Sequence, residues 1–443
     1  MREIAILELL DSWNFWTKQP EIGLPRKRYL QAIIPLFSTN QAIALTGVRR
    51  SGKSTLMMQL AQQLINSGVA PRNILIINWE DYRWENPSLK LLGQVYEIYR
   101  KKVSTGKLVY LFLDEIHKIV GWERFVRTVI DQKEAKIVLS GSSAQLLSRE
   151  LGSLLTGRHV AIPVFPLSFE ELLEFKGLSI RDELELVGKK RAVQQCIDES
   201  MTYGFLPEVV LSAEAAAKQK TLVDYIEAII TRDVVERHKI KEKEKLRSLA
   251  RFYLTNPCSP ISFNKIKEML ALPLHTVERF SYYLEEAYLL LFLKRFSYKV
   301  REQEKSPRKV YSIDPGLLQA YSFKFMENTG TLMENLVFLE LMKDGKEVYY
   351  WKNPQQEEVD FVVKEGLKVK QLLQVCYRLD SPDTKKREIR ALLKAMKEFN
   401  LQEGSVITSD YEDEEQNQGK TIRYIPLWRW LWRKEGRIIG AVE

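Results

Sequence analysis

A glycine-rich loop between an apolar run and a helical pattern constrains the fold of this chain more than any other feature. The loop is Gly47-Val-Arg-Arg-Ser-Gly-Lys-Ser-Thr55, with apolar residues at 42–46 before it and apolar residues at helical spacing over 56–65 after it. Glycines let successive backbone N–H groups turn toward one point, and the helix N-terminus adds partial positive charge there. The order strand, loop, helix predicts a phosphate-binding P-loop.

The loop assigns roles to single side chains. We expect Lys53 to reach the β- and γ-phosphates of ATP, and the hydroxyl of Ser54 to ligate Mg²⁺. The expected cofactors are therefore ATP and Mg²⁺. The residues predicted to bind the nucleotide are Gly47, Arg50, Ser51, Gly52, Lys53, Ser54 and Thr55.

A second apolar run, 108–113, ends in the carboxylates Asp114 and Glu115. A buried strand that ends in Asp114 can hold the Mg²⁺ shell, and Glu115 beside it can polarise the attacking water. Acidic residues also favour the start of a helix, so a purely structural role is the alternative. A P-loop about sixty residues upstream favours the catalytic interpretation.

Two further stretches hold candidate catalytic residues. The run 137–139 is followed by Ser140, Gly141 and Ser142, and a hydroxyl there either touches the γ-phosphate or the lytic water, or belongs to an ordinary turn. Both Ser140 and Ser142 are candidates. Arg158, before the last apolar run, is either a finger toward a phosphate or part of a surface salt bridge.

The rhythm of strands and helices over residues 37–165 predicts an α/β core with a parallel sheet covered on both faces. The strands are expected at 42–46, 74–78, 108–113, 137–139 and 160–164. Asp114-Glu-Ile-His117 also matches a helicase motif. No second RecA-like domain is visible, so we interpret His117 as an ordinary helix-start residue.

The flanking segments suggest further domains. Residues 1–36 form an aromatic-rich arm that either packs near the nucleotide base or is exposed. Residues 166–245 read as a helical lid that begins with a capping box, Ser168 to Glu171. Residues 246–322 have the order of a winged helix, and 323–443 form another α/β unit.

Charge and composition suit a soluble, cytoplasmic protein. The net charge of +9 is compatible with a polyanionic partner such as DNA. The three cysteines are scattered, and no apolar run is long enough for a membrane span. The expected recognition helix, 276–286, has three glutamates and few basic residues, so a protein partner is as well supported as DNA.

Eight short motifs in order make the chain similar to archaeal and bacterial AAA+ ATPases that carry a C-terminal DUF4143 domain. They are Gly47–Thr55, 113–116, 139–143, 157–158, 166–170, 203–208, 309–314 and 358–363. The resemblance implies a P-loop AAA+ core, a helical lid, a winged helix and a C-terminal restriction-endonuclease-like α/β domain. It also implies self-association into a ring, expected as a hexamer, with Arg158 a possible finger toward a neighbour's nucleotide.

The nuclease pattern of that last domain is incomplete. Glu334 and Asp360 match it, and Glu358 is a possible substitute ligand. Gln374 and Cys376 stand where the pattern has Glu and Lys, so they supply neither a charged metal ligand nor a charge-stabilising lysine. We expect a nuclease-like fold without strong nuclease activity.

The sequence thus predicts an ATP hydrolase that couples its cycle to binding or remodelling of DNA, branched or single-stranded. The alternative is a nucleotide-dependent switch that binds protein partners without processing DNA.

Overall fold

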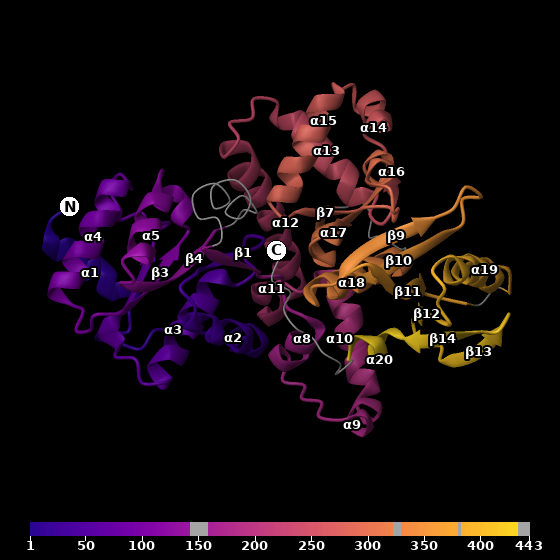
Figure 1. Ribbon diagram of the computed structural model, residues 1–443, viewed down its shortest axis with the longest axis horizontal. Coiled ribbons are helices and arrows are strands. Elements are labelled where there is room, and N and C mark those ends of the chain that lie inside the picture. The colour runs from indigo at the N-terminus through magenta and orange to yellow at the C-terminus, as the bar shows by residue number, and fades with distance from the viewer. Residues whose placement is uncertain (142–157, 322–328, 380–381, 433–443) are drawn as a thin grey trace. The chain divides into compact units, whose positions relative to one another are not determined.

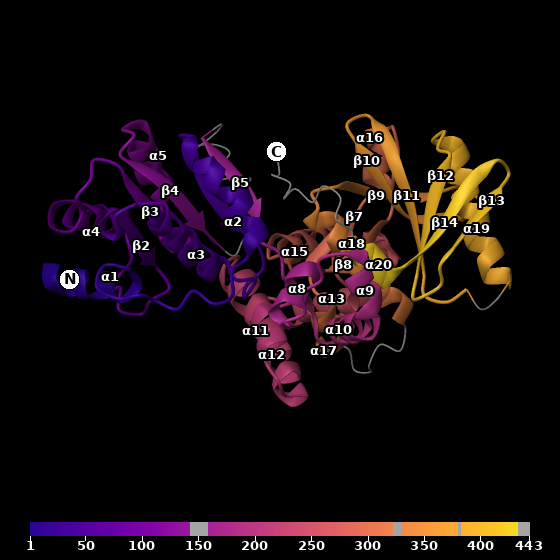
Figure 2. The same cartoon turned by 90° about the horizontal axis from the view of Figure 1, so that it is seen from below.

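The computed structural model describes residues 1–141, 158–321, 329–379 and 382–432. The chain divides into two compact units, built on Met1–Val164 and Phe165–Ile438. Figures 1 and 2 show the elements of both. No helix among the described residues is long and apolar enough to span a bilayer.

The first unit is built on a five-stranded parallel sheet. Its strands are β1 (Ala42–Thr46), β2 (Ile74–Asn78), β3 (Val109–Asp114), β4 (Ala135–Ser140) and β5 (His159–Pro163). The order is β2-β3-β4-β1-β5, and every neighbouring pair is parallel. The strands are buried nearly throughout, as expected of a sheet covered on both faces. The predicted parallel α/β core is confirmed.

Helices cover both faces of this sheet (Figure 1). On one face α1 (Glu3–Trp13), α4 (Leu89–Lys102) and α5 (Trp122–Asp131) share an apolar core with Leu111 and Leu113 of β3. On the other, α2 (Lys27–Ile33) and α3 (Lys53–Asn66) pack with Phe112. Short 3₁₀ turns lie at Ile34–Ser38, Pro71–Asn73 and Ile116–Lys118.

The aromatic segment near the N-terminus seals the edge of the sheet. Asn14 pairs with the edge strand β2 like a missing neighbour: its Nδ2 donates to the Ile76 carbonyl at 2.9 Å, and its Oδ1 accepts from the Ile76 N–H at 2.7 Å. Trp16 Nε1 donates to the Ile74 carbonyl at 2.9 Å. Because β2 is separated from the P-loop strand β1 by β3 and β4, Asn14 and Trp16 block an open sheet edge away from the loop. Later residues of the same arm pack against α3, where Gln59 Nε2 donates to the Ile22 and Leu24 carbonyls, so packing of the arm near the nucleotide stays a prediction.

The second unit begins with helices, as predicted for a lid. They are α8 (Phe169–Phe175), α9 (Glu183–Gly188), α10 (Lys190–Tyr203), α11 (Pro207–Leu211) and α12 (Ala215–Ala228), followed by a π-helical stretch, η4 (Ile229–Glu236). The capping box is confirmed: Ser168 Oγ accepts from the Glu171 N–H, and the Glu171 carboxylate accepts from the Ser168 N–H.

A small helical and antiparallel module follows. It comprises α13 (Lys243–Thr255), β6 (Pro260–Ile261), α14 (Phe263–Leu270), α15 (Leu274–Glu286), β7 (Leu290–Leu293), α16 (Val300–Lys305), β8 (Arg308–Ser312) and α17 (Pro315–Tyr321). Its strands are ordered β6-β8-β7. The connection between β7 and β8 contains the short helix α16.

The last module has a six-stranded mixed sheet, ordered β13-β14-β12-β11-β10-β9. Its elements are α18 (Thr329–Lys343), β9 (Glu347–Lys352), β10 (Glu358–Glu365), β11 (Lys368–Cys376), α19 (Pro382–Glu398), β12 (Glu403–Thr408), β13 (Asp413–Asn417), β14 (Lys420–Pro426) and α20 (Leu427–Leu431). The chain after β7 adds to the edge of this sheet, because the Phe296 N–H donates to the Tyr350 carbonyl at 2.7 Å and the Tyr350 N–H to the Lys294 carbonyl at 3.1 Å. The two modules are therefore joined by backbone hydrogen bonds.

A buried carboxylate ties the lid helices to the turn after β8. Asp314 Oδ2 accepts from the Phe205 N–H at 2.6 Å, and its Oδ1 accepts from the Gly316 N–H at 2.9 Å. Burial raises the pKa of Asp314 to about 7. Gly204, with φ of +79°, leaves the space that this carboxylate fills.

We expect Gly204→Ala to destabilise the second unit by several kcal/mol, because the added methyl group would overlap the Asp314 carboxylate and the backbone conformation is strained for alanine. Urea unfolding measures the loss. Gly366→Ala is the matched control, since Gly366 also has positive φ (+58°) but open space around its Cβ position. Equal losses in the two variants would show that the overlap contributes nothing.

Candidate active site

The P-loop leaves the carboxyl end of β1 and enters α3 at Lys53. Gly47 has a φ of +138°, and a Cβ there would overlap the carbonyl of Val164. Lys53 is buried, and its Nζ donates to the carbonyls of Gly47 at 2.9 Å and Val48 at 3.0 Å. The loop is therefore folded around the lysine. The two carbonyl acceptors are neutral, and a charged phosphate oxygen would accept a stronger hydrogen bond from the ammonium.

Other loop residues lie as a phosphate cradle requires. The Ser51 hydroxyl is buried without a hydrogen-bond partner among the described residues. Ser54 and Thr55 are exposed in the first turn of α3, and Arg50 has a φ of +68°. Arg26, from the basic cluster of the N-terminal arm, supports the loop by donating from Nη1 to the Ser51 carbonyl at 2.9 Å.

Asp114 ends β3 as a buried carboxylate at the meeting point of three segments. The Ser140 hydroxyl donates to its Oδ1, and the Ser54 side chain from α3 is also hydrogen-bonded to it. Burial raises the pKa of Asp114, which these hydrogen bonds and the charge of Lys53 oppose. Since β4 lies between β1 and β3, Ser140 stands between the P-loop and the carboxylates. Ser142, the other candidate serine, lies outside the described residues.

Glu115 is held in a strained, left-handed conformation (φ +51°) directly after Asp114. Its N–H donates to Ser140 Oγ at 3.1 Å. Burial raises its pKa to about 7, a value suited to a general base at neutral pH. His117 Nδ1 lies 3.2 Å from Glu115 Oε2, so His117 belongs to the site and is not merely the start of a helix.

A further ion pair, which the sequence did not indicate, borders these residues. Arg49 of the loop lies 3.4 Å from Glu80, which follows β2. The charge of Glu80 raises the pKa of both Asp114 and Glu115, and Arg49 lowers that of Glu115. Glu80 directly follows the strand predicted at 74–78, whose carboxyl end lies at the same sheet edge as the P-loop. That position in the sequence could have identified Glu80 as a residue near the site.

Arg158 lies at the opposite edge of the sheet. Its Nη1 is 2.9 Å from Asp131 Oδ1 at the end of α5, and its carbonyl accepts from the Ala42 N–H at the start of β1. A five-residue strand spans about 16 Å, so Arg158 does not reach the nucleotide site of its own chain. Of the two alternatives, the surface salt bridge describes its position, and a catalytic role within the same chain is wrong. Action on a neighbour's nucleotide stays a prediction.

The C-terminal domain holds a second cluster of carboxylates, and a lysine from outside that domain fills it. Lys309 of β8 is buried, and its Nζ lies 3.0 Å from Glu334 Oε1, 2.7 Å from Glu358 Oε1 and 2.9 Å from Asp360 Oδ1. The Tyr311 hydroxyl also donates to Glu334, at 2.8 Å. Burial raises the pKa of Glu334 to about 7. Burial by itself would lower the pKa of Lys309. The neighbouring carboxylates have the larger effect and raise the pKa of Lys309 well above its usual value.

The residues that depart from the nuclease pattern are used structurally. Gln374 accepts from the Asp360 N–H at 3.3 Å and donates to Glu388 at 2.6 Å. The Cys376 thiol points to the Arg378 carbonyl at 3.1 Å, and burial raises its pKa to about 11. Within the described residues no set of three or more His, Cys, Asp or Glu side chains is arranged to hold a metal ion.

Three family models match the chain. An AAA domain matches residues 39–173, a domain of unknown function (DUF8612) matches 194–327, and a second domain of unknown function (DUF4143) matches 329–430.

Two relatives are similar over most of their length. An uncharacterized protein of Methanocaldococcus jannaschii is 31% identical over 405 residues, which cover 88% of each chain. An uncharacterized protein of Haemophilus influenzae is 30% identical over 413 residues, which cover 91% of this chain and 98% of the relative. Among solved structures, a Walker-type ATPase of Pyrococcus abyssi has a TM-score of 0.42 and 12% identity, covering 70% of this chain and 99% of that one. The chain belongs to the archaeal and bacterial family of AAA-type ATPases that carry a C-terminal DUF4143 domain.

Proposed function

We propose that the protein hydrolyses ATP with Mg²⁺ and couples the cycle to binding or remodelling of DNA. The observation that carries the hydrolysis is the convergence of Lys53, Asp114 and Glu115, with Ser140 hydrogen-bonded to both acidic residues. These groups come from three segments and supply a phosphate ligand, a metal ligand and a base.

Phosphate binding falls to the loop. The backbone amides around Gly52 and the α3 N-terminus bind the phosphates, and the Lys53 ammonium exchanges its two carbonyl acceptors for phosphate oxygens. Ser54 and Asp114 are the residues that would hold Mg²⁺, because a hydroxyl and a carboxylate are hard oxygen ligands already in contact. When bound, the ion neutralises charge on the β- and γ-phosphates.

Activation of water falls to Glu115. Its carboxylate accepts the proton of the attacking water, while the hydrogen bond to Ser140 fixes its backbone and His117 lies against its Oε2. Catalysis then depends on positioning and electrostatics, as in other phosphoryl transfers. Arg158 is proposed to act only between subunits, in a ring formed by self-association.

DNA binding is supported by residues 243–312, the segment from α13 to β8, which we call the 243–312 module. Its element order is that of a winged helix. The segment 294–308 carries six lysine or arginine residues and two glutamates, suited to phosphates. The glutamates of α15 favoured a protein partner, but Glu286 is buried against His238 at 3.4 Å. The outer face of α15 is therefore less acidic than its sequence suggests.

We also propose that the C-terminal domain does not cleave DNA. Its three carboxylates Glu334, Glu358 and Asp360 already share the buried Lys309 ammonium, which takes the place where a divalent cation would have to bind.

Glu115→Gln should lower kcat for ATP hydrolysis by about 10²- to 10⁴-fold, because the amide cannot accept the proton of water. Binding of ATP should persist, since Lys53 and the loop are unchanged. A phosphate-release assay and a fluorescent-nucleotide titration measure the two effects, and size-exclusion chromatography of this variant with ATP tests the ring. Glu97→Gln, at an exposed pair with Lys101, is the control. Normal turnover by Glu115→Gln would refute the mechanism.

DNA should stimulate the ATPase and bind with an affinity that falls steeply with salt, because phosphate contacts release counterions. Anisotropy titrations with single-stranded, duplex and branched oligonucleotides over a range of salt concentrations measure both properties. Absence of binding at low salt would contradict the coupling to DNA and favour the alternative, a nucleotide-dependent switch for protein partners.

Lys309→Met should destabilise the second unit by about 3–5 kcal/mol, because it leaves buried carboxylates without their cation. Urea unfolding at pH 7 measures this. Lys346→Met, at the partly exposed pair with Glu365, should cost less than about 1 kcal/mol and serves as the control. If both variants unfold at the same urea concentration, the cluster is not held by Lys309.

A further inference from the structure

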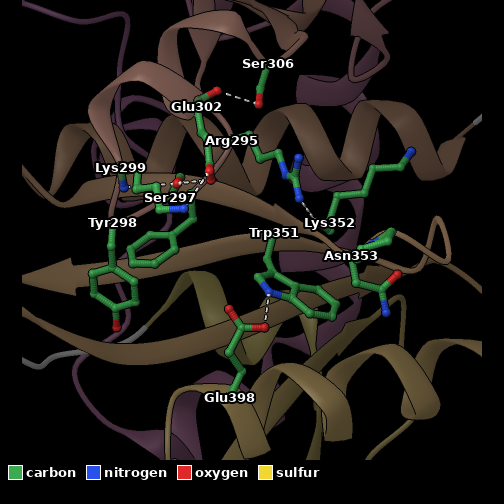
Figure 3. Close-up of a pocket in the computed structure, with 12 residues that line it drawn as sticks. Arg295, Ser297, Tyr298, Lys299, Glu302, Ser306, Trp351, Lys352, Asn353 and Glu398 are labelled. Carbon is green, nitrogen blue, oxygen red and sulfur yellow. Dashed lines mark hydrogen bonds and ion pairs between the residues drawn. The ribbon is translucent and has the colours of Figure 1, made fainter.

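A pocket of about 300 Å³ lies where the 243–312 module meets the C-terminal sheet (Figure 3). One wall is the segment from Arg295 to α16, and the other is formed by the end of β9 with Glu398 of α19. The backbone hydrogen bonds of Tyr350 with Phe296 and Lys294 join these walls, so the pocket is part of one packed body.

The pocket contains an arginine, Arg295, that forms no ion pair within the described residues, although its charge acts at longer range on Glu302. Arg295 Nη2 donates to the Lys352 carbonyl, while its Nε is buried without an acceptor in that part of the chain. The carboxylates of the pocket are engaged: Glu302 lies 3.1 Å from Lys299 Nζ, and Glu398 accepts from Trp351 Nε1 at 3.0 Å. The unused donor of a guanidinium beside a cavity suits an anion, and phosphate above all.

The rim adds an aromatic face. Tyr298 is 75% exposed, although its ring meets Phe296 edge to face at 5.0 Å. Lys299 beside it is 77% exposed at its side chain. An open tyrosine next to cations is the combination with which proteins bind single-stranded nucleic acid, since a base stacks on the ring while cations follow the backbone.

We propose that this pocket binds one nucleotide unit of single-stranded DNA, with its phosphate at Arg295 and its base on Tyr298. The proposal rests on the proposed function and adds to it that the DNA is single-stranded and that Arg295 and Tyr298 contact it. An unpaired base is required because the bases of a duplex are stacked on each other and do not expose a face to a side chain. A volume of about 300 Å³ is at the lower end of small-ligand pockets, which suits a single nucleotide.

The test is an anisotropy titration of the full chain with a labelled twelve-residue oligo-dT. Tyr298→Ala should weaken binding by about 5- to 100-fold through loss of stacking. Arg295→Gln should weaken it and lower the slope of log K against log salt by about 0.7. Tyr298→Trp should bind like the unaltered protein. Lys368→Ala, at an exposed lysine of β11, is the control that should leave oligo-dT binding unchanged. Tyr282→Ala, at a half-exposed tyrosine of α15, is the comparison that separates this pocket from the expected recognition helix.

Unchanged affinity in both Tyr298→Ala and Arg295→Gln, with binding by the unaltered protein intact, would overturn this site and leave the proposed function standing. Weakening by Tyr282→Ala alone would also overturn it and direct attention to α15. Equal binding of a poly-glutamate peptide, lost in the same variants, would assign the pocket to an acidic protein segment instead. Failure of the unaltered protein to bind any DNA would overturn the proposed coupling itself.

Discussion

The buried carboxylate of Asp114 is the constraint on which the nucleotide site depends. A carboxylate in a dry setting needs donors, and Asp114 takes them from Ser140 on β4 and from Ser54 on α3. Both donors are available only because β4 runs between β1 and β3 and because the P-loop ends at the same sheet edge. The proposed metal ligand, the phosphate loop and the proposed base are thereby fixed by one small set of hydrogen bonds.

The second unit also holds carboxylates away from solvent, but there a lysine and not a pair of serines interacts with them. Glu334, Glu358 and Asp360 surround the buried ammonium of Lys309, which comes from the neighbouring module. Because this cation is part of the chain, it offsets some of the negative charge without exchanging with solvent, and it joins the two modules where a metal ion would otherwise have to bind. The departures at Gln374 and Cys376 agree with this, since both side chains are used in packing and hydrogen bonding.

The sequence predicted the features that depend on neighbours along the chain. The loop Gly47–Thr55, the strand that ends in Asp114, and the capping box at Ser168 all rest on local spacing. The sequence did not reveal contacts made across the fold, such as Lys309 with Asp360. Arg158 is a third case. It precedes a predicted parallel strand, so the predicted topology already placed it at the amino ends of the strands, whereas the P-loop lies at the carboxyl ends. The sequence interpretation considered only that Arg158 lies next to a strand and not which end it occupies.

The P-loop site and the carboxylate cluster of the C-terminal domain differ in whether their lysine is available to a ligand. This difference indicates the role of each site. Lys53 is held by neutral carbonyls, so its charge can be given to phosphates, and exposed Ser54 keeps the site open to solvent. The Lys309 ammonium is already shared among carboxylates and closed off. The proposed hydrolysis of ATP is therefore assigned to the first unit. In the second unit, Arg295 forms no ion pair within the described residues, and its unused donor lies at the pocket proposed to bind a nucleotide.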